Sequence, residues 1–183
     1  MQKMEQKKIS MAKTMEFDGK SDKETVFREV RQNLNARGFK ITASDDQRPW
    51  GGFFVIDESM SNRFIMDFFP HLSPADFDGF KKLSPKILLV APGKKLSWQY
   101  HYRRSEIWKV IGGSVAVAKS ATDEEGEPVP MKPGSVIELE KGERHRLIGT
   151  DTWGVVAEIW RHTDPAHPSD EDDIVRLQDD FGR

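Results

Sequence analysis

Two segments of the chain carry side chains that could bind a metal ion, one with Gln99, His101 and Glu106 and the other with His145. Alternate residues of an extended strand point to the same face, so Gln99 and His101 would be neighbours. A turn after His101 can bring Glu106 back beside them, and Gly142 permits a tight turn that lets His145 join. Two imidazoles, one carboxylate and one amide oxygen suit Zn, Mn, Fe, Co or Ni better than Ca or Cu(I). The spacing therefore predicts a divalent metal site with open positions for substrate oxygens.

Glu158 is a candidate for a second acidic group near this site. It lies in the run 154–160, which reads as a strand, and shares a face with Val156 and Trp160. If that face points inward, the carboxylate needs a partner, and burial near a metal could tune it as a general base. If it points outward, or pairs with an arginine, its role is structural. The sequence leaves both interpretations open, and Glu106 is the alternative proton carrier.

Several basic residues could bind a phosphate group or take part in catalysis. The candidates are Arg48, Lys95, Arg104 and Arg176, because guanidinium groups bind phosphate bidentately and an ammonium group binds it as a point charge. Each also has a structural interpretation. Arg48 could close the barrel mouth with Trp50, Arg176 could tie down the acidic C-terminal segment, and Lys95 and Arg104 could simply be solvated.

The elements that must position these residues are mainly strands. From residue 50 onwards, short β-type runs alternate with Gly, Pro and Asp, a pattern typical of a sandwich or barrel. The predicted strands are 52–57, 62–69, 86–91, 95–101, 105–111, 114–119, 135–140, 145–149 and 154–160. Between them we expect a loop with a short helix over 70–85 and a polar turn over 120–133.

One helix is predicted before the strands, over 22–37. Ser21 and Glu24 fit a capping box, and Gly38 is a natural stop. Four apolar residues recur at helical spacing, namely Val26, Phe27, Val30 and Leu34. We therefore expect 1–45 to be a flexible tail followed by this helix, and 46–183 to form the β-barrel domain.

Composition limits the classes of function. The chain has 183 residues, a net charge of −2 and no cysteine, so a nucleic-acid footprint, a disulfide framework and a thiolate metal site are not expected. No apolar run approaches the roughly 18–20 residues that span a bilayer, and the N-terminus lacks the apolar stretch of a secretory signal. We expect a cytoplasmic protein without nucleic-acid or membrane partners.

Both metal-binding segments resemble the two motifs of the cupin superfamily. The first motif matches at Gly93, Gln99, His101, Glu106 and Gly113, with Gln99 in place of the usual first histidine. The second matches at Gly134, Gly142 and His145. The resemblance implies an all-β fold, a cupin or jelly-roll β-barrel.

The glutamine variant is similar to the C-terminal cupin domain of type II mannose-6-phosphate isomerases. Four blocks match in order, at 48–51 (RPWG), 92–108, 142–147 (GERHRL) and 171–183 (EDDIVRLQDDFGR), with an insertion near 58–85. The chain departs from that family at Tyr102 and Arg103, where histidines are usual, and at Lys95, where an arginine is usual. The resemblance implies a metal-dependent aldose–ketose isomerase acting on a sugar phosphate such as mannose 6-phosphate, and a homodimer.

Two other classes of function remain open at the level of sequence. The barrel could bind or sense a sugar without converting it, or it could be a metal-dependent cupin of another chemistry, such as an oxygenase. One fold hosts many functions, so the fold alone does not separate these alternatives.

Overall fold

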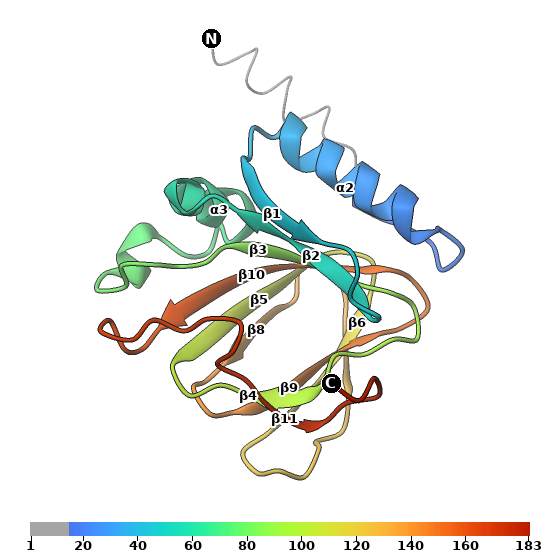
Figure 1. The fold of residues 1–183 in the computed structure, drawn as a ribbon. Coiled ribbons are helices and arrows are strands. Elements are labelled where there is room, and N and C mark those ends of the chain that lie inside the picture. The colour runs from blue at the N-terminus through green and yellow to red at the C-terminus, as the bar shows by residue number, and fades with distance from the viewer. Residues whose placement is uncertain (1–14) are drawn as a thin grey trace.

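Two antiparallel sheets form the body of the protein in a computed structural model that describes residues 15–183 (Figure 1). Sheet A has six strands, in the spatial order β1 (Ile41–Asp45), β2 (Gly51–Ile56), β3 (Lys86–Val90), β10 (Gly154–His162), β5 (Arg104–Gly112) and β8 (Val136–Leu139). Sheet B has five strands, in the order β11 (Val175–Gln178), β4 (Trp98–Tyr100), β9 (Arg144–Gly149), β6 (Val115–Ser120) and β7 (Val129–Met131). Strands far apart in sequence lie side by side in both sheets. The predicted all-β barrel of the jelly-roll type is confirmed.

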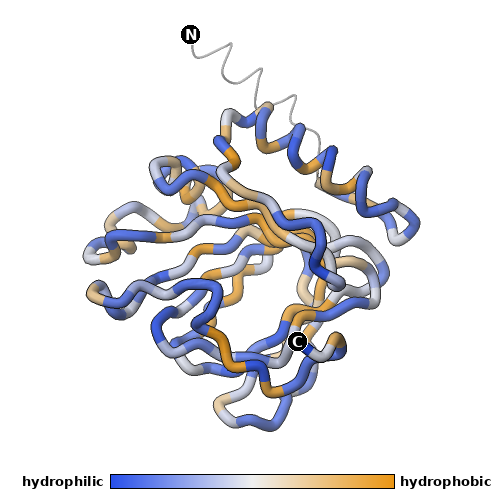
Figure 2. Tube along the Cα trace, in the orientation of Figure 1, coloured by the Kyte–Doolittle hydropathy of each residue, from blue (hydrophilic) through white to orange (hydrophobic). Residues whose placement is uncertain are grey.

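Sheet A separates two hydrophobic cores. The barrel core lies between the sheets and includes Trp108 and Leu147. The outer core, which includes Phe27 and Phe54, covers the other face of sheet A beneath the helices α2 (Lys23–Ala36) and α3 (Ser61–Phe68). Strand β3 is consequently buried at all five positions, and Figure 2 shows hydrophobic residues concentrated along this part of the sheet. The central strands of sheet A, which carry Glu106 and Glu158, are thus covered on both faces.

The N-terminal helix is confirmed with a different cap. Asp22, not Ser21, is the N-cap residue of α2, because its carboxylate accepts a hydrogen bond of 2.8 Å from the backbone N–H of Thr25. The hydroxyl of Ser21 instead donates to Asp18. Gly38 ends the helix as predicted, with a positive φ of 84°. The helix shares the outer core with sheet A, which fixes it on the barrel.

The strand predicted over 62–69 is wrong, because this segment forms α3 after a 3-10 turn at Glu58–Met60. The aromatic and β-branched residues of the segment favour a strand, but the buried positions are Phe64, Ile65 and Phe68. In a helix, that spacing puts all three side chains on one face. Packing of this face in the outer core therefore favours the helix over the strand. The short helix expected within 70–85 is present at Pro74–Phe77.

Three strands were not predicted, namely β1, β7 and β11. Each lies at the edge of a sheet and contains mostly exposed residues, so that hydrogen bonding to a neighbouring strand, and not an apolar pattern, defines it. Strand β7 lies inside the expected polar turn over 120–133. The predicted strand over 95–101 is shortened to β4, and Lys95 makes only an isolated bridge to Ile148.

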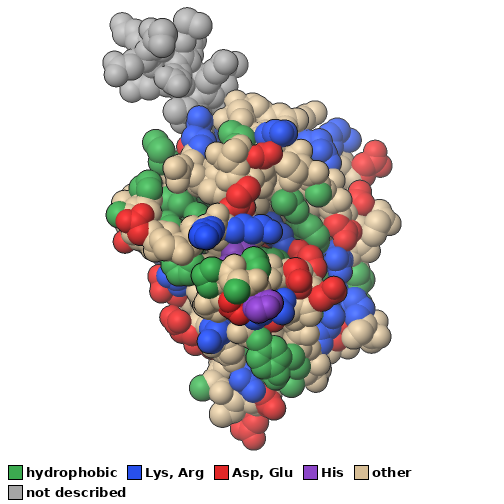
Figure 3. Space-filling view, turned by 60° about the vertical axis from the view of Figure 1, so that its left-hand side comes forward, with side chains coloured by type: hydrophobic (Ala, Val, Ile, Leu, Met, Phe, Trp, Pro, Cys, Tyr) green, Lys and Arg blue, Asp and Glu red, His purple; other side chains and the backbone are tan. Residues whose placement is uncertain are grey.

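The surface of the molecule carries charges of both signs. On the face drawn in Figure 3, lysine and arginine side chains gather in a band across the middle, with acidic side chains on either side. Among the described residues, no helix is long and apolar enough to cross a membrane.

Two substitutions in α3 distinguish whether this segment is a helix or a strand. Phe64 is fully buried, whereas Met66 is 66% exposed, although the two residues would share one face of a strand. We expect Phe64→Ala to lower the free energy of unfolding by about 3–5 kcal/mol, and Met66→Ala to change it by no more than about 0.5 kcal/mol. Urea denaturation measures both. Similar losses in the two variants would contradict the helix.

Candidate metal centre

Three of the four predicted metal ligands meet inside the barrel. His101 directly follows β4, Glu106 lies on β5 and His145 lies on β9, and their ligand atoms all lie within 4.8 Å of one another. The Nε2 atoms of the two histidines are 3.3 Å apart. Glu106 approaches His101 Nε2 at 3.2 Å and His145 Nε2 at 3.6 Å. All three residues are at most 2% exposed.

The hydrogen bonds of the two imidazoles orient their lone pairs toward each other. His101 Nδ1 is 2.7 Å from the backbone oxygen of Asp173, and His145 Nδ1 is 2.9 Å from the backbone oxygen of Glu143. A carbonyl oxygen only accepts hydrogen bonds, so both Nδ1 atoms must carry the proton. Both Nε2 lone pairs therefore face the region of Glu106, where that of His101 accepts a hydrogen bond of 3.2 Å from Nη2 of Arg104. This is the second-layer arrangement usual for metal-binding histidines.

The electrostatics of the cluster fit a cation. Burial lowers the pKa of His145 to about 4, so its imidazole is neutral at physiological pH and free to act as a ligand. Burial raises the pKa of Glu106, but the interactions with His101 and Arg104 outweigh that effect and hold it well below its usual range. Within residues 15–183, Glu106 Oε2 is buried and has no hydrogen-bond partner. Two facing lone pairs and an unpartnered carboxylate oxygen form a donor set that suits a divalent metal ion.

Gln99 lies next to this cluster on β4. It stands opposite His145 in the pairing of β4 with β9, and it is buried. Its side-chain oxygen accepts a hydrogen bond of 2.6 Å from the hydroxyl of Ser97. An amide oxygen has a second lone pair, so this bond fixes the orientation of Gln99 and leaves room for one more interaction.

Arg104 lies beside the cluster, not at the rim of the barrel. Its Nε donates to Glu106 Oε1 at 2.8 Å, and its Nη1 donates to the hydroxyl of Ser169 and the backbone oxygen of Asp170. Its guanidinium carbon lies 3.6 Å from the ring centroid of Trp160. The side chain is 5% exposed. Arg104 thus compensates the charge of Glu106 and is already engaged in hydrogen bonds.

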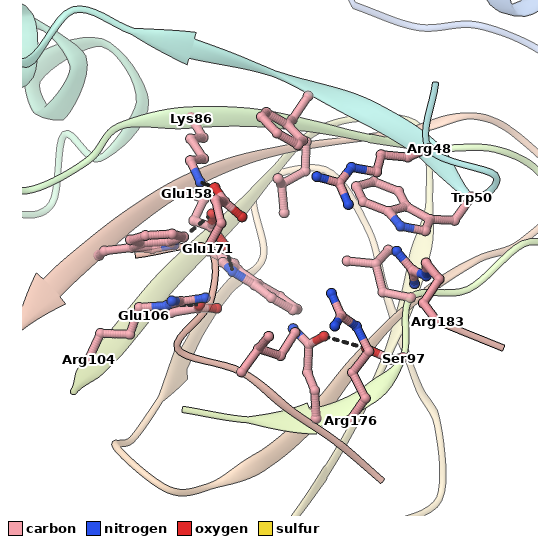
Figure 4. A pocket seen from close by; sticks show the side chains of 17 residues that line it. Arg48, Trp50, Lys86, Ser97, Arg104, Glu106, Glu158, Glu171, Arg176 and Arg183 are labelled. Carbon is pink, nitrogen blue, oxygen red and sulfur yellow. Dashed lines mark hydrogen bonds and ion pairs between the residues drawn. The ribbon is translucent and has the colours of Figure 1, made fainter. Parts of the chain in front are cut away.

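The cluster adjoins a cavity of about 80 Å³, room for several water molecules (Figure 4). Glu158 lines one side of this cavity, so the inward-facing interpretation holds. The indole N–H groups of Trp108 and Trp160 donate to its two oxygens at 2.7 and 2.9 Å. Burial, and after it the charge of Glu106, raise the pKa of Glu158 to about 8. The two buried glutamates therefore differ strongly in proton affinity.

Lys86 lies beside Glu158 in the cavity and was not predicted from the sequence. Its ammonium nitrogen is 3.8 Å from the ring centroid of Trp160 and forms an ion pair with Glu171. The side chain is buried in a strand whose other residues are apolar. A single charged residue at the start of such a strand was the available signal, because buried charges need a functional or structural partner.

Three arginines line the opposite side of the cavity (Figure 4). Arg48 pairs with Asp45 at 2.8 Å, and Arg183, which was not predicted, pairs with Asp179 at 2.9 Å. Arg176 comes from β11. Partial burial, and then the positive charge of Arg183, lower the pKa of the Arg176 guanidinium, which indicates that the cations lie close together. Convergent guanidinium groups favour an anion.

Of the residues predicted to act in catalysis or to bind substrate, Lys95 is the one that the structure does not bring to the cavity. Its ammonium nitrogen lies 3.7 Å from the Asp180 carboxylate, and both side chains are partly exposed. Among residues 15–183, the side chains that line the cavity do not include Lys95.

The raised pKa of Glu158 predicts how stability depends on pH. Between pH 4.5, its ordinary pKa, and about pH 8, the carboxyl group of Glu158 is protonated in the native state but ionised in the unfolded state. The contribution of this bound proton to the free energy of unfolding is therefore complete below pH 4.5 and is lost as the pH rises through 8. We expect the stability difference between Glu158→Gln and the wild type to shift in favour of the variant by roughly 1 kcal/mol per pH unit between about pH 5 and 8. Urea denaturation of the metal-free protein over this range measures it. The exposed Glu138→Gln is the matched control, and a pH-independent difference for Glu158→Gln would contradict the raised pKa.

Comparisons with known proteins identify the family to which the chain is similar. Residues 68–179, more than half of the chain, match the family model described as mannose-6-phosphate isomerase C-terminal. The chain is 25% identical over 150 residues to a mannose-1-phosphate guanylyltransferase of Salmonella montevideo, covering 82% of this chain and 26% of that protein. It is 28% identical over 159 residues to the alginate biosynthesis protein AlgA of Pseudomonas aeruginosa, covering 84% of this chain and 26% of that protein. The chain thus spans about a quarter of the length of these relatives.

Similar solved structures include a DMSP lyase, with a TM-score of 0.48 and 13% identity over 84% of this chain and 70% of that chain. Another is described as a sugar phosphate isomerase from a cupin superfamily of Silicibacter pomeroyi, with a TM-score of 0.40 and 20% identity over 49% of this chain and 56% of that chain. The order of the strands, the two motif segments and the family match lead to one conclusion. The chain has a cupin fold and belongs to the mannose-6-phosphate isomerase C-terminal family.

Proposed function

We propose that this protein is a metal-dependent aldose–ketose isomerase that acts on a sugar phosphate, with mannose 6-phosphate as the first substrate to test. The observation that carries the proposal is the convergence of His101, Glu106 and His145 next to a cavity that also contains Glu158. The family description supports this choice of substrate class.

Four residues would hold the metal ion, namely Gln99, His101, Glu106 and His145. A divalent cation bound there would polarise the carbonyl and hydroxyl oxygens of the sugar and acidify the C–H bond between them. Zn, Mn, Co, Ni and Fe all fit a set of imidazole, carboxylate and amide donors.

Glu158 is the proposed proton carrier. Its ionised carboxylate takes the proton from C2 of the open-chain aldose and delivers it to C1, while the hydroxyl proton moves from O2 to O1, so that atoms and charge balance. A pKa of about 8 lies close to a working pH near neutrality, where a general base is most effective. Glu106 is less suited to this role, because it is paired with Arg104 and belongs to the ligand set.

The three arginines across the cavity are the proposed phosphate site. Arg48, Arg176 and Arg183 lie opposite Glu158 and Lys86 (Figure 4). Arg48 and Arg183 each pair with one carboxylate, and a phosphate group would add the negative charge that this cluster of cations favours. This arrangement would direct the carbonyl end of the sugar phosphate toward the metal centre.

The oligomeric state and the cellular location belong to the same proposal. We infer a homodimer and a cytoplasmic location, as expected from the resemblance and the composition. Size-exclusion chromatography with light scattering would test the first, since a dimer has twice the 21.0 kDa mass of the chain.

An isomerase assay with defined metals tests the central proposal. Metal-free protein is loaded separately with Zn, Mn, Co, Ni or Fe(II) and given mannose 6-phosphate, and formation of fructose 6-phosphate is followed. We expect turnover that disappears in His145→Ala, together with metal binding. Glu158→Gln should keep its metal and lose about 100-fold or more in kcat, because it cannot carry the proton.

Other outcomes of this assay distinguish the alternatives. A sugar that raises the melting temperature without being converted would support a binding or sensing protein. Oxygen consumption by the Fe(II) form would support an oxygenase. Either result, combined with the absence of isomerisation by all metal forms, would refute the proposed reaction.

The phosphate site is tested by removing one cation. We expect Arg176→Met to raise the KM for mannose 6-phosphate about 10-fold or more, because it removes charge-assisted hydrogen bonds to the phosphate. Arg28→Met, an equal change of charge at an exposed position of α2, is the control and should leave KM unchanged. An equally unchanged KM in Arg176→Met would place the phosphate elsewhere.

A further inference from the structure

The segment between β10 and β11 returns to the metal centre and contacts it through Asp173. This residue is 6% exposed, although it lies in a chain segment with many exposed carboxylates. Its backbone oxygen accepts the hydrogen bond of 2.7 Å from Nδ1 of His101. That bond selects the tautomer of His101 whose Nε2 lone pair faces the proposed metal position.

The carboxylate of Asp173 holds the turn between two metal ligands. Its Oδ1 accepts the backbone N–H of Tyr102 at 3.0 Å, and its Oδ2 accepts the backbone N–H of Arg103 at 3.0 Å. These two residues lie between His101, at the end of β4, and Glu106, on β5. The hydroxyl of Ser169 also donates to Oδ2, at 2.6 Å. One side chain thus fixes the short connection on which the relative positions of two ligands depend.

The same segment also orients Arg104. Nη1 of Arg104 donates to the hydroxyl of Ser169 at 2.8 Å and to the backbone oxygen of Asp170 at 3.0 Å. Through these bonds the guanidinium is directed so that its Nε reaches Glu106 at 2.8 Å. Ser169 therefore links the carboxylate of Asp173 to the cation that compensates Glu106.

We propose that Asp173 is a positioning residue for the metal centre, which fixes the tautomer of His101 and the turn between His101 and Glu106 through its backbone oxygen and its carboxylate. The proposal rests on the metal centre of the proposed function. Asp173 is not one of the proposed metal ligands and acts through them. Outer partners of this kind contribute about 10- to 100-fold to metal affinity.

The test compares Asp173→Asn with the wild type. The substitution keeps the shape of the side chain but places an amide NH2 group against one of the two backbone N–H donors, so the turn loses an acceptor. Asp172→Asn is the matched control, since Asp172 is an exposed neighbour in the same segment. Ser169→Ala is a milder second variant that removes one bond to Asp173 and one to Arg104.

Two properties of the folded proteins are measured. The dissociation constants for Zn²⁺ and Co²⁺ are obtained by competition with a chromophoric chelator, and the visible spectrum of the Co²⁺ form reports the ligand geometry. We expect Asp173→Asn to bind both metals about 10- to 100-fold more weakly and to show a changed Co²⁺ spectrum, with a smaller effect in Ser169→Ala and none in Asp172→Asn.

The outcomes separate this proposal from the one on which it rests. A wild type that binds neither metal would overturn the metal centre itself and the role of Asp173 with it. A wild type that binds metal, combined with unchanged affinity and spectrum in Asp173→Asn, would overturn only the positioning role. If Asp173→Asn does not fold, the metal affinity and Co²⁺ spectrum of Ser169→Ala are used instead, and unchanged values would overturn the positioning role. A lower melting temperature of the metal-free variant without any change in affinity or spectrum would show a purely structural role and overturn the proposal.

Discussion

A carboxylate buried inside a barrel must be compensated by positive charge or by hydrogen-bond donors, and this barrel contains two such groups. Glu106 is compensated by the guanidinium of Arg104, and its pKa is held low. Glu158 receives two indole N–H groups, which carry no net charge, and burial raises its pKa to about 8. Two glutamates on neighbouring strands thereby differ in proton affinity, as the proposed roles of ligand for Glu106 and proton carrier for Glu158 require.

The double-sided burial of sheet A makes this separation possible. Helices α2 and α3 cover its outer face, so the central strands β3 and β10 are shielded from water on both faces. Lys86 and Glu158, which face each other across these two strands, are therefore held at fixed positions. Without the outer core, one face of the sheet would be solvated, and the strands would position the cavity less rigidly.

The sequence predicts the candidate metal ligands more readily than their surroundings. The convergence of His101, Glu106 and His145 could be predicted because strand alternation and turn glycines translate spacing directly into proximity. The partners of these ligands lie far away in sequence. Tyr102 and Asp173 are 71 positions apart, and no local pattern encodes such a contact.

The errors in secondary structure have an equally non-local cause. The segment 62–69 has the composition of a strand, but its apolar residues fit a helix face, and the outer core selects the helix. Strands β1 and β11 contain mostly exposed residues and exist because a neighbouring strand offers hydrogen bonds. Lys95 fits the motif by its position, yet the turn after β3 directs it to Asp180 and away from the cavity.

The position of Trp160 between two cations has an optical consequence. Lys86 Nζ and the guanidinium carbon of Arg104 lie 3.8 and 3.6 Å from its ring centroid, too close for both to share one face of the ring. Its indole N–H points to Glu158. The electric field along the indole therefore changes when Glu158 loses its proton, and so do the near-ultraviolet transitions of the ring. The near-ultraviolet spectrum of Trp160 therefore reports the protonation state of Glu158 without any added label.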